Sequence, residues 1–90
     1  MPEYRTLVFS TEFVETYGSR DFSFAERRQF QRALLLLDTN ERHPSLRVHA
    51  LSGDQQGWWS ASASDVLRVV FRRLPDGRKR LGACSRHYDR

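Results

Sequence analysis

The stretch from Arg47 to Phe71 decides the fold, and it reads RVHALSGDQQGWWSASASDVLRVVF. Apolar and polar residues alternate through much of it with the period of two that is typical of half-buried β-strands. The glycines at positions 53 and 57 interrupt the alternation and predict a connection between strands. Together with its flanking residues, the stretch predicts three strands, over Leu46–Leu51, Trp58–Ser64 and Val66–Leu74.

The most apolar of these strands contains an arginine, Arg68. The alternation places Leu67, Val69 and Phe71 on one face of the strand, and Val66, Arg68, Val70 and Arg72 on the other. Burying a guanidinium without a partner is very costly, so Arg68 must meet a carboxylate, a backbone acceptor or a phosphate. Structural pairing with Asp65 or Asp38 and binding of a phosphate agree equally well with the pattern.

The residues before this stretch predict one strand and two helices. Tyr4–Phe9 is rich in β-branched and aromatic residues and predicts a strand. Ser10 and Thr11 are both suited to cap a short helix that ends near Gly18. A second, longer helix begins after a capping box and carries an apolar stripe at helical spacing. The box is Ser23 with Glu26, and the stripe is Phe30, Ala33, Leu34 and Leu37.

The order of these elements predicts the fold class. Pro75–Gly77 predicts a tight turn, and a final short strand follows it and ends at Arg86 and His87. The order is therefore β-α-α-β-β-β-β, an α+β fold in which two helices pack on one face of a mainly antiparallel, twisted sheet. A length of 90 residues predicts one domain over residues 1–90.

The charge of the chain is positive and unevenly distributed, with a formal net charge of +4. Residues 1–45 contain six Lys and Arg against seven Asp and Glu, whereas residues 46–90 contain nine against four. This asymmetry favours a polyanion as partner, or an acidic protein that competes for the same surface. The single cysteine, Cys84, excludes an intramolecular disulfide, and no apolar run approaches the roughly 20 residues of a membrane span. We therefore expect a cytoplasmic protein with no membrane partner.

Histidines are the candidate proton-transfer residues. No phosphate-binding glycine loop, nucleophile elbow or metal-binding histidine pair occurs in the sequence, so no metal or cofactor is predicted. With a reference pKa of about 6.5, His43, His49 and His87 can each act as an acid or a base near neutral pH. His49 and His87 are the stronger candidates, because each flanks a strand that can pair beside the strand of Arg68.

Several of these segments, in this order, resemble the RelE/ParE-like superfamily of bacterial toxins, and among them the mRNA interferases. The segments are HPSLRVHALSG, GWWSASAS, LRVVF, PDG and a histidine after a short final strand, and they span residues 43 to 87. The two preceding helices also fit the layout of that family. Three features depart from its pattern: Leu67 replaces the tyrosine that usually precedes the strand arginine, Ser62 stands where some relatives have another histidine, and the segment after His87 is short and lacks the customary aromatic tail.

The resemblance implies the toxin of a type II toxin–antitoxin system, which cuts mRNA on the ribosome without a metal or cofactor. In that chemistry a ribose 2′-OH attacks the adjacent phosphate, which requires a base, an acid and a cation beside the phosphate. Carried over by position, His49 and His87 are the candidate acid and base, and Arg68 is the candidate phosphate ligand. The inferred RNA contacts are Arg47, Trp59, Arg72 and Arg86.

The resemblance also implies a partner, an acidic or DNA-binding antitoxin with which the chain forms a hetero-oligomer. Two other functions remain open. One is a ParE-like gyrase inhibitor that cleaves nothing, and the other is a catalytically weakened relative that binds its antitoxin and acts as a corepressor. The two candidate histidines favour the nuclease, because an inhibitor needs no proton transfer, whereas the short final segment favours the corepressor.

Overall fold

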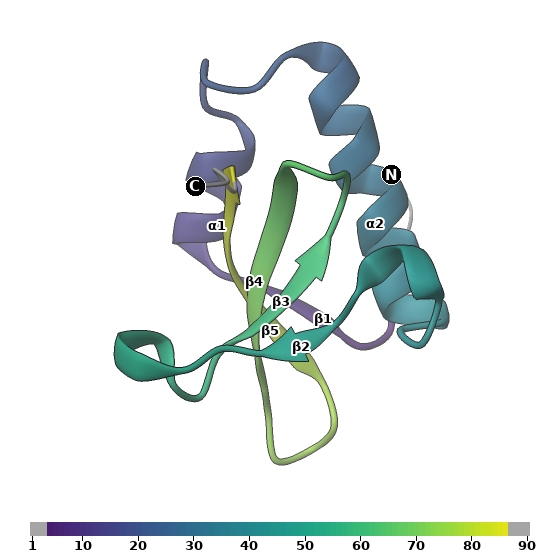
Figure 1. Cartoon of the computed structure of the whole chain (residues 1–90), viewed down its shortest axis with the longest axis vertical. Coiled ribbons are helices and arrows are strands. Elements are labelled where there is room, and N and C mark those ends of the chain that lie inside the picture. Colours follow the sequence, from purple (N-terminus) through teal and green to yellow (C-terminus); the bar gives the residue numbers. More distant parts are fainter. Residues whose placement is uncertain (1–3, 87–90) are drawn as a thin grey trace.

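The fold is a five-stranded sheet with two helices on one face (Figure 1). A computed structural model describes residues 4–86 of the chain. The strands are β1 (Leu7–Phe9), β2 (His49–Ala50), β3 (Trp59–Ser62), β4 (Leu67–Arg73) and β5 (Lys79–Arg86). Their order in the sheet is β1-β5-β4-β3-β2, and every neighbouring pair is antiparallel except β1 and β5. The predicted α+β class and mainly antiparallel sheet are thus confirmed.

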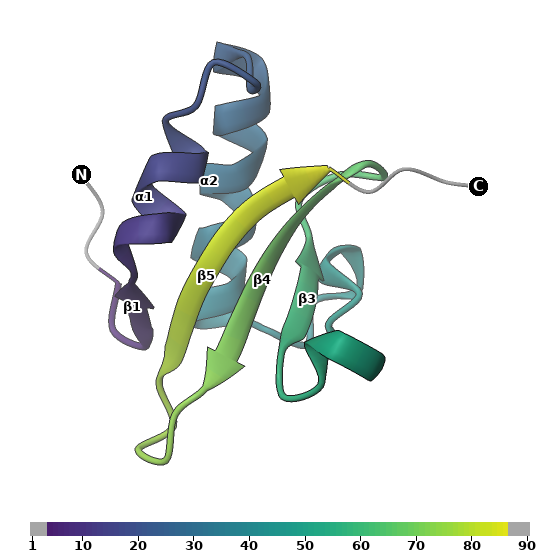
Figure 2. The ribbon, with the colours of Figure 1, turned by 90° about the vertical axis from the view of Figure 1, so that its left-hand side faces the viewer.

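The helices α1 (Thr11–Tyr17) and α2 (Phe24–Thr39) lie on the same side of the sheet (Figure 2). The side chain of Ser10 caps α1 by accepting a hydrogen bond from its first turn. The predicted capping box begins α2, with reciprocal side chain to backbone hydrogen bonds between Ser23 and Glu26. These caps satisfy N–H groups that a first helical turn leaves unpaired, which explains both starting points. Within residues 4–86, neither helix combines the length and apolar character that crossing a membrane requires.

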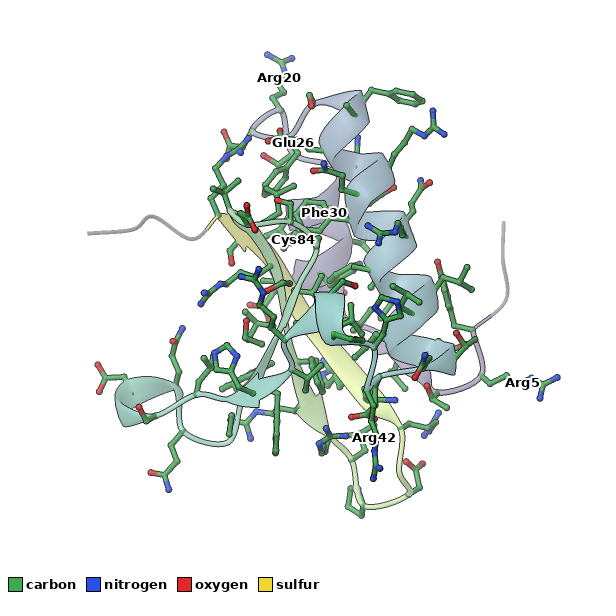
Figure 3. All side chains as sticks on the ribbon, turned by 45° about the vertical axis from the view of Figure 1, so that its right-hand side comes forward. Arg5, Arg20, Glu26, Phe30, Arg42 and Cys84 are labelled. Atoms are coloured by element: carbon green, nitrogen blue, oxygen red, sulfur yellow. The ribbon has the colours of Figure 1, made fainter. Side chains whose placement is uncertain are left out.

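The hydrophobic core lies between α2 and the face of the sheet that the helices cover. The predicted stripe of α2 is buried, and alternate residues of β4 complete the core together with Leu81 and Cys84 of β5. These residues are Phe30, Ala33, Leu34, Leu37, Leu67, Val69, Phe71, Leu81 and Cys84. Phe30 and Cys84 lie between the helix and the sheet in Figure 3. The core therefore fixes which face of β4 remains for other roles.

The prediction of a strand over Leu46–Leu51 is wrong for most of its length. Only His49–Ala50 pair with β3, and Pro44–Leu46 form a turn of 3-10 helix. The proline of this turn has no N–H to offer a sheet. Arg47 then adopts a left-handed backbone conformation, with a φ of 46°, and leads the chain into β2. Both features replace the first residues of the expected strand with a tight turn.

The first strand is shorter than the predicted Tyr4–Phe9, because β1 covers only Leu7–Phe9. The carboxylate of Asp38, near the end of α2, accepts hydrogen bonds from the backbone N–H groups of Arg5 and Thr6. The bond to the N–H of Thr6 is 2.7 Å long. This side chain holds the residues before β1 against the end of α2, while the carbonyl oxygen of Thr6 still accepts a hydrogen bond from the N–H of Lys79 in β5.

Candidate functional site

The face of the sheet that the helices leave uncovered carries most of the candidate residues, and we call it the open face. Its side chains alternate along β3 and β4 with those of the core. The strand register aligns His49, Ser60, Val70 and Ala83 in one row, and Ser62, Arg68 and Ser85 in the next. Ser60 is covered, with 1% of its surface exposed, whereas the short side chains of Ser62, Ala83 and Ser85 remain partly exposed around Arg68 and Val70.

Arg68 lies on the open face, as predicted, and is half-buried. The two carboxylates that the sequence offered as structural partners are engaged elsewhere. Asp38 binds Thr6, and Asp65 lies 3.5 Å from a guanidinium nitrogen of Arg47. With the residues in positions 4–86, Arg68 forms neither an ion pair nor a side-chain hydrogen bond. Its fixed positive charge is therefore presented by the strand to whatever binds the open face.

His49 shares the open face with Arg68, and β3 lies between the two. The side chain of His49 is exposed, and its Nδ1 lies 2.9 Å from the backbone carbonyl oxygen of Arg47. A carbonyl oxygen can only accept, so this nitrogen carries the proton in the hydrogen bond. In the neutral ring, Nε2 of His49 is then the basic nitrogen. The geometry suits this histidine to proton transfer.

Trp58 is an aromatic residue of the open face that is not among the predicted site residues. The guanidinium carbon of Arg72 lies 4.6 Å from the centre of the Trp58 ring. The ring also lies against Gly82, which is opposite a register irregularity between Val70 and Phe71. A Cβ atom at position 82 would lie 2.5 Å from the ring, so the indole occupies space that only a glycine leaves.

Trp59, the predicted stacking residue, lies on the other face of the sheet. It pairs with Phe71 of β4, whose side chain belongs to the core. The guanidinium of Arg73 lies over the Trp59 ring at 4.4 Å, and the same guanidinium forms an ion pair with Glu41. The structure therefore does not bring Trp59 together with Arg68. The alternation in the sequence also predicts this placement, because residues 59 and 61 share a face of the strand and Ala61 belongs to the core.

Arg86 is also held on the helix-covered side, at the end of β5. Its guanidinium binds the carboxylate of Glu26, with one N–O distance of 2.8 Å, and donates to the backbone carbonyl of Asp21. It also lies 5.2 Å from the centre of the Phe22 ring. These contacts tie the end of β5 to the start of α2, where Figure 3 labels Glu26. Arg86 thus has a structural role that the sequence did not reveal.

The ion pair between Glu26 and Arg86 predicts a pH dependence of stability. The hydrogen bonds from Arg86, and then that from the backbone of Ser23, lower the pKa of Glu26 from 4.5 to about 2. A carboxyl group whose pKa is lower in the folded than in the unfolded protein stabilises the fold at pH values above its unfolded pKa. This stabilisation is lost as the pH falls through the folded pKa. We therefore expect Glu26→Gln to unfold at a lower temperature than the unchanged protein near neutral pH, and the difference to disappear as the pH falls from 4.5 to about 2.

Thermal unfolding followed by circular dichroism across this pH range measures the difference directly. Glutamine can still close the capping box, so the variant isolates the charge of Glu26 from its capping role. Glu15→Gln is the matched control, because the exposed Glu15 loses the same charge without a partner among residues 4–86. A Glu26→Gln difference that stayed constant with pH would contradict the assignment of the effect to this ion pair.

The remaining candidates are Arg47 and His87. Arg47 is exposed beside His49, and its guanidinium lies close to the carboxylate of Asp65. His87 lies outside the described residues. The strand that leads to it, β5, ends at Arg86, and the residue before, Ser85, pairs with Arg68. The described chain thus ends one residue before His87, next to the strand position of Arg68.

Other reactive groups in the described residues offer less. Burial raises the pKa of the Cys84 thiol to about 12, so this cysteine is not a thiolate at neutral pH. Within residues 4–86, no group of three or more His, Cys, Asp and Glu side chains is placed to hold a metal ion. Among residues 4–86, the groups of the open face that can act on a ligand therefore include the arginines that β4 and β5 place there, the imidazole of His49 and the indole of Trp58.

Neither a protein-family model nor a curated protein sequence matches this chain. Solved structures do. A YoeB/ParE toxin from Agrobacterium tumefaciens superposes with a TM-score of 0.72 at 20% identity, over 93% of this chain and 100% of that one. A YoeB–YefM complex from Staphylococcus aureus gives 0.67 at 19% identity, over 91% and 95% of the two chains. YafQ from E. coli gives 0.63 at 16% identity, over 91% and 92%. The chain thus has the fold of RelE/ParE-like toxins, as its motifs predicted.

Proposed function

We propose that this chain, with its RelE/ParE-like toxin fold, is the toxin of a type II toxin–antitoxin system and cleaves mRNA on the ribosome. The observation that carries the proposal is the placement of Arg68. It projects from the open face without a protein partner among residues 4–86, and it shares that face with His49. A fixed cation and an exposed imidazole on one face of a sheet suit a phosphodiester better than they suit an uncharged substrate.

The proposed reaction is a transesterification. The 2′ oxygen of one ribose forms a bond to the adjacent phosphorus, and the bond from phosphorus to the 5′ oxygen of the next nucleotide breaks. A base takes the proton of the 2′-OH, and an acid gives a proton to the leaving 5′ oxygen. Nε2 of His49 is one candidate for these roles, and His87 is the other. Arg68 stabilises the extra negative charge that develops on the phosphate oxygens in the transition state.

The proposed partner is an antitoxin with an acidic segment. Arg68, Arg72 and Arg80 all belong to the open-face positions of β4 and β5, which explains where part of the positive charge of the C-terminal half lies. An acidic peptide on this face would compete with RNA for the same cations. Of the structural neighbours, YoeB–YefM from Staphylococcus aureus and RelBE2 from Mycobacterium tuberculosis are toxin–antitoxin complexes. A cytoplasmic location, where ribosomes translate messages, belongs to the same proposal.

The experiment that tests this function is induced expression in a bacterial host, with transcript 5′ ends mapped before and after induction. We expect growth to stop and new 5′ ends to appear within translated messages. Removing a general acid or base typically costs about 100-fold or more in rate, so His87→Ala and His49→Ala should each restore growth. Intact messages with broken DNA would support gyrase inhibition instead. Absence of toxicity in several hosts would support the corepressor.

A further inference from the structure

A pocket with a volume of about 340 Å³ lies on the open face beside the row of Arg68, and we call it the Trp58 pocket. Its lining comes from β4, β5, the turn that follows β2, and the start of α1. The lining includes Glu12, Asp54, Trp58, Val70, Arg80 and Ala83. Because Val70 follows Arg68 by two positions on the same face of β4, the two side chains are about 7 Å apart along the strand.

The aromatic side of this pocket is held in place by its neighbours. Gly82 leaves the space that the Trp58 ring fills, and Arg72 stacks on the ring. The guanidinium of Arg72 is itself close to Gly57, where a Cβ atom would lie 3.6 Å from it. An indole packed in this way offers a flat, apolar surface whose orientation costs little entropy to fix. Such a surface suits a planar ring.

The charged residues of the pocket have opposite signs and do not pair with one another. Glu12, Asp54 and Arg80 are exposed, and none forms an ion pair or a side-chain hydrogen bond with any residue in positions 4–86. Elsewhere on the molecule, arginines near carboxylates do pair, as Arg73 does with Glu41. The two carboxylates can accept hydrogen bonds, and the guanidinium can donate them. The pocket therefore suits a ligand that has donors on one edge and acceptors on another.

From these features we infer that the Trp58 pocket binds a guanine base of the RNA strand, next to the phosphate that Arg68 contacts. Guanine presents O6 and N7 as paired acceptors for an arginine such as Arg80. Its opposite edge presents N1–H and the N2 amino group, two adjacent donors for a carboxylate of Glu12 or Asp54. Uracil fits less well, because it offers the carboxylates only one N–H donor. A phosphate fits less well too, because two carboxylates would repel its negative charge. This inference rests on the proposed RNA substrate and adds a base preference to it.

The test measures binding without cleavage. RNA hexamers in which every ribose is 2′-O-methylated lack the attacking hydroxyl, so the purified protein can bind them but cannot cut them by the proposed route. Each hexamer carries one guanine, adenine or cytosine in a uridine background, with the all-uridine hexamer as reference. Fluorescence anisotropy of an end label gives the affinity. We expect the guanine hexamer to bind about tenfold more tightly than the adenine hexamer, which is the discrimination one good bidentate contact supplies.

Variants then assign the preference to the pocket. The double variant Glu12→Gln with Asp54→Asn and the single variant Arg80→Met should each reduce the guanine preference to about twofold or less, if each removes one bidentate contact. Glu15→Gln should keep it, because Glu15 lies on the same helix as Glu12 and does not line the pocket. All of these side chains are exposed, so the variants are expected to fold, and circular dichroism checks that they do.

The outcomes separate the base preference from the proposed nuclease. Equal affinity for the four hexamers, or a guanine preference that survives the Glu12 and Asp54 changes, would overturn the guanine assignment even if the protein cleaved messages in cells. A guanine preference that depends on the pocket residues would support the assignment, even if no message were cleaved and the nuclease proposal failed. In an active nuclease, the same preference should appear as guanine enrichment beside the mapped transcript ends, and it should fade in the Arg80→Met variant.

Discussion

Replacement of Arg68 by methionine is expected to reduce RNA cleavage by about 100-fold or more, while the temperature of unfolding stays nearly unchanged. The first expectation follows from the loss of the only candidate phosphate cation that β4 presents at the row of Ser62 and Ser85. The second follows from the absence of any ion-pair partner for Arg68 among residues 4–86, because its removal leaves no described carboxylate unpaired. Cleavage of a reporter message in a translation extract measures the first, and calorimetry measures the second.

Arg20→Met is the matched control for this experiment. Arg20 is exposed between the two helices, and Figure 3 shows its side chain pointing away from the rest of the molecule. Removing this positive charge changes the net charge of the chain equally but leaves the open face intact. We expect no loss of cleavage. If both variants lost activity to the same extent, the effect would come from overall charge and not from Arg68.

Arg68→Lys adds a second comparison, because it keeps the charge and loses the planar fork of donors. An intermediate rate would indicate that Arg68 contacts the phosphate through two hydrogen bonds. A rate equal to that of the unchanged protein would show that charge alone is sufficient. If Arg68→Met instead unfolded the protein, a structural role for the arginine would replace the proposed catalytic one.

The sequence predicts much of the fold because local signals agree with the tertiary structure. The capping box at Ser23 places the start of α2 correctly, and the alternation in β4 places Arg68 opposite Leu67 and Val69. By contrast, Asp38 shortens β1 through hydrogen bonds to residues more than 30 positions away. No local pattern in Tyr4–Phe9 contains that information, which is why the boundary was wrong.

The placement of the candidate residues on the two faces of the sheet was predicted in part for the same reason. Period-two alternation is local, so it determines the faces of Arg68 and Arg72, and it also places Trp58 on the face opposite to Trp59. The partner of Arg86 is Glu26, which is 60 residues away. A sequence shows that an arginine lies near the end of a strand, but it does not show which distant carboxylate occupies it.

The open face depends on the core behind the same strands. Val69 and Phe71 of β4 are buried against the helices, and they alternate with Arg68, Val70 and Arg72 on the open face. A strand that moved on its core side would therefore move its open-face side chains as well. This coupling links the stability of the protein to the geometry of the site, and it can be tested from the helix side.

Replacement of Phe30 by alanine is expected to destabilise the fold by about 3–5 kcal/mol. Phe30 is completely buried in the middle of α2, and its ring contacts that of Phe22 edge-to-face, with the centres 5.0 Å apart. Truncation removes the buried ring and leaves a cavity between α2 and the sheet, where Figure 3 labels Phe30. Since small domains are stable by only about 5–15 kcal/mol, the variant should be partly unfolded at growth temperature. Urea unfolding followed by circular dichroism measures the loss.

Phe24→Ala on the same helix is the matched control. Phe24 begins α2 and is 73% exposed, so the same chemical change removes little buried surface and should alter stability by no more than about 0.5 kcal/mol. A similar loss in both variants would contradict the description of the core. If Phe30→Ala still folds in the cold, its residual cleavage at low temperature should fall further than its folded fraction, because the cavity lies behind the strands that position Arg68. Cleavage that simply followed the folded fraction would show that the open face is rigid independently of α2.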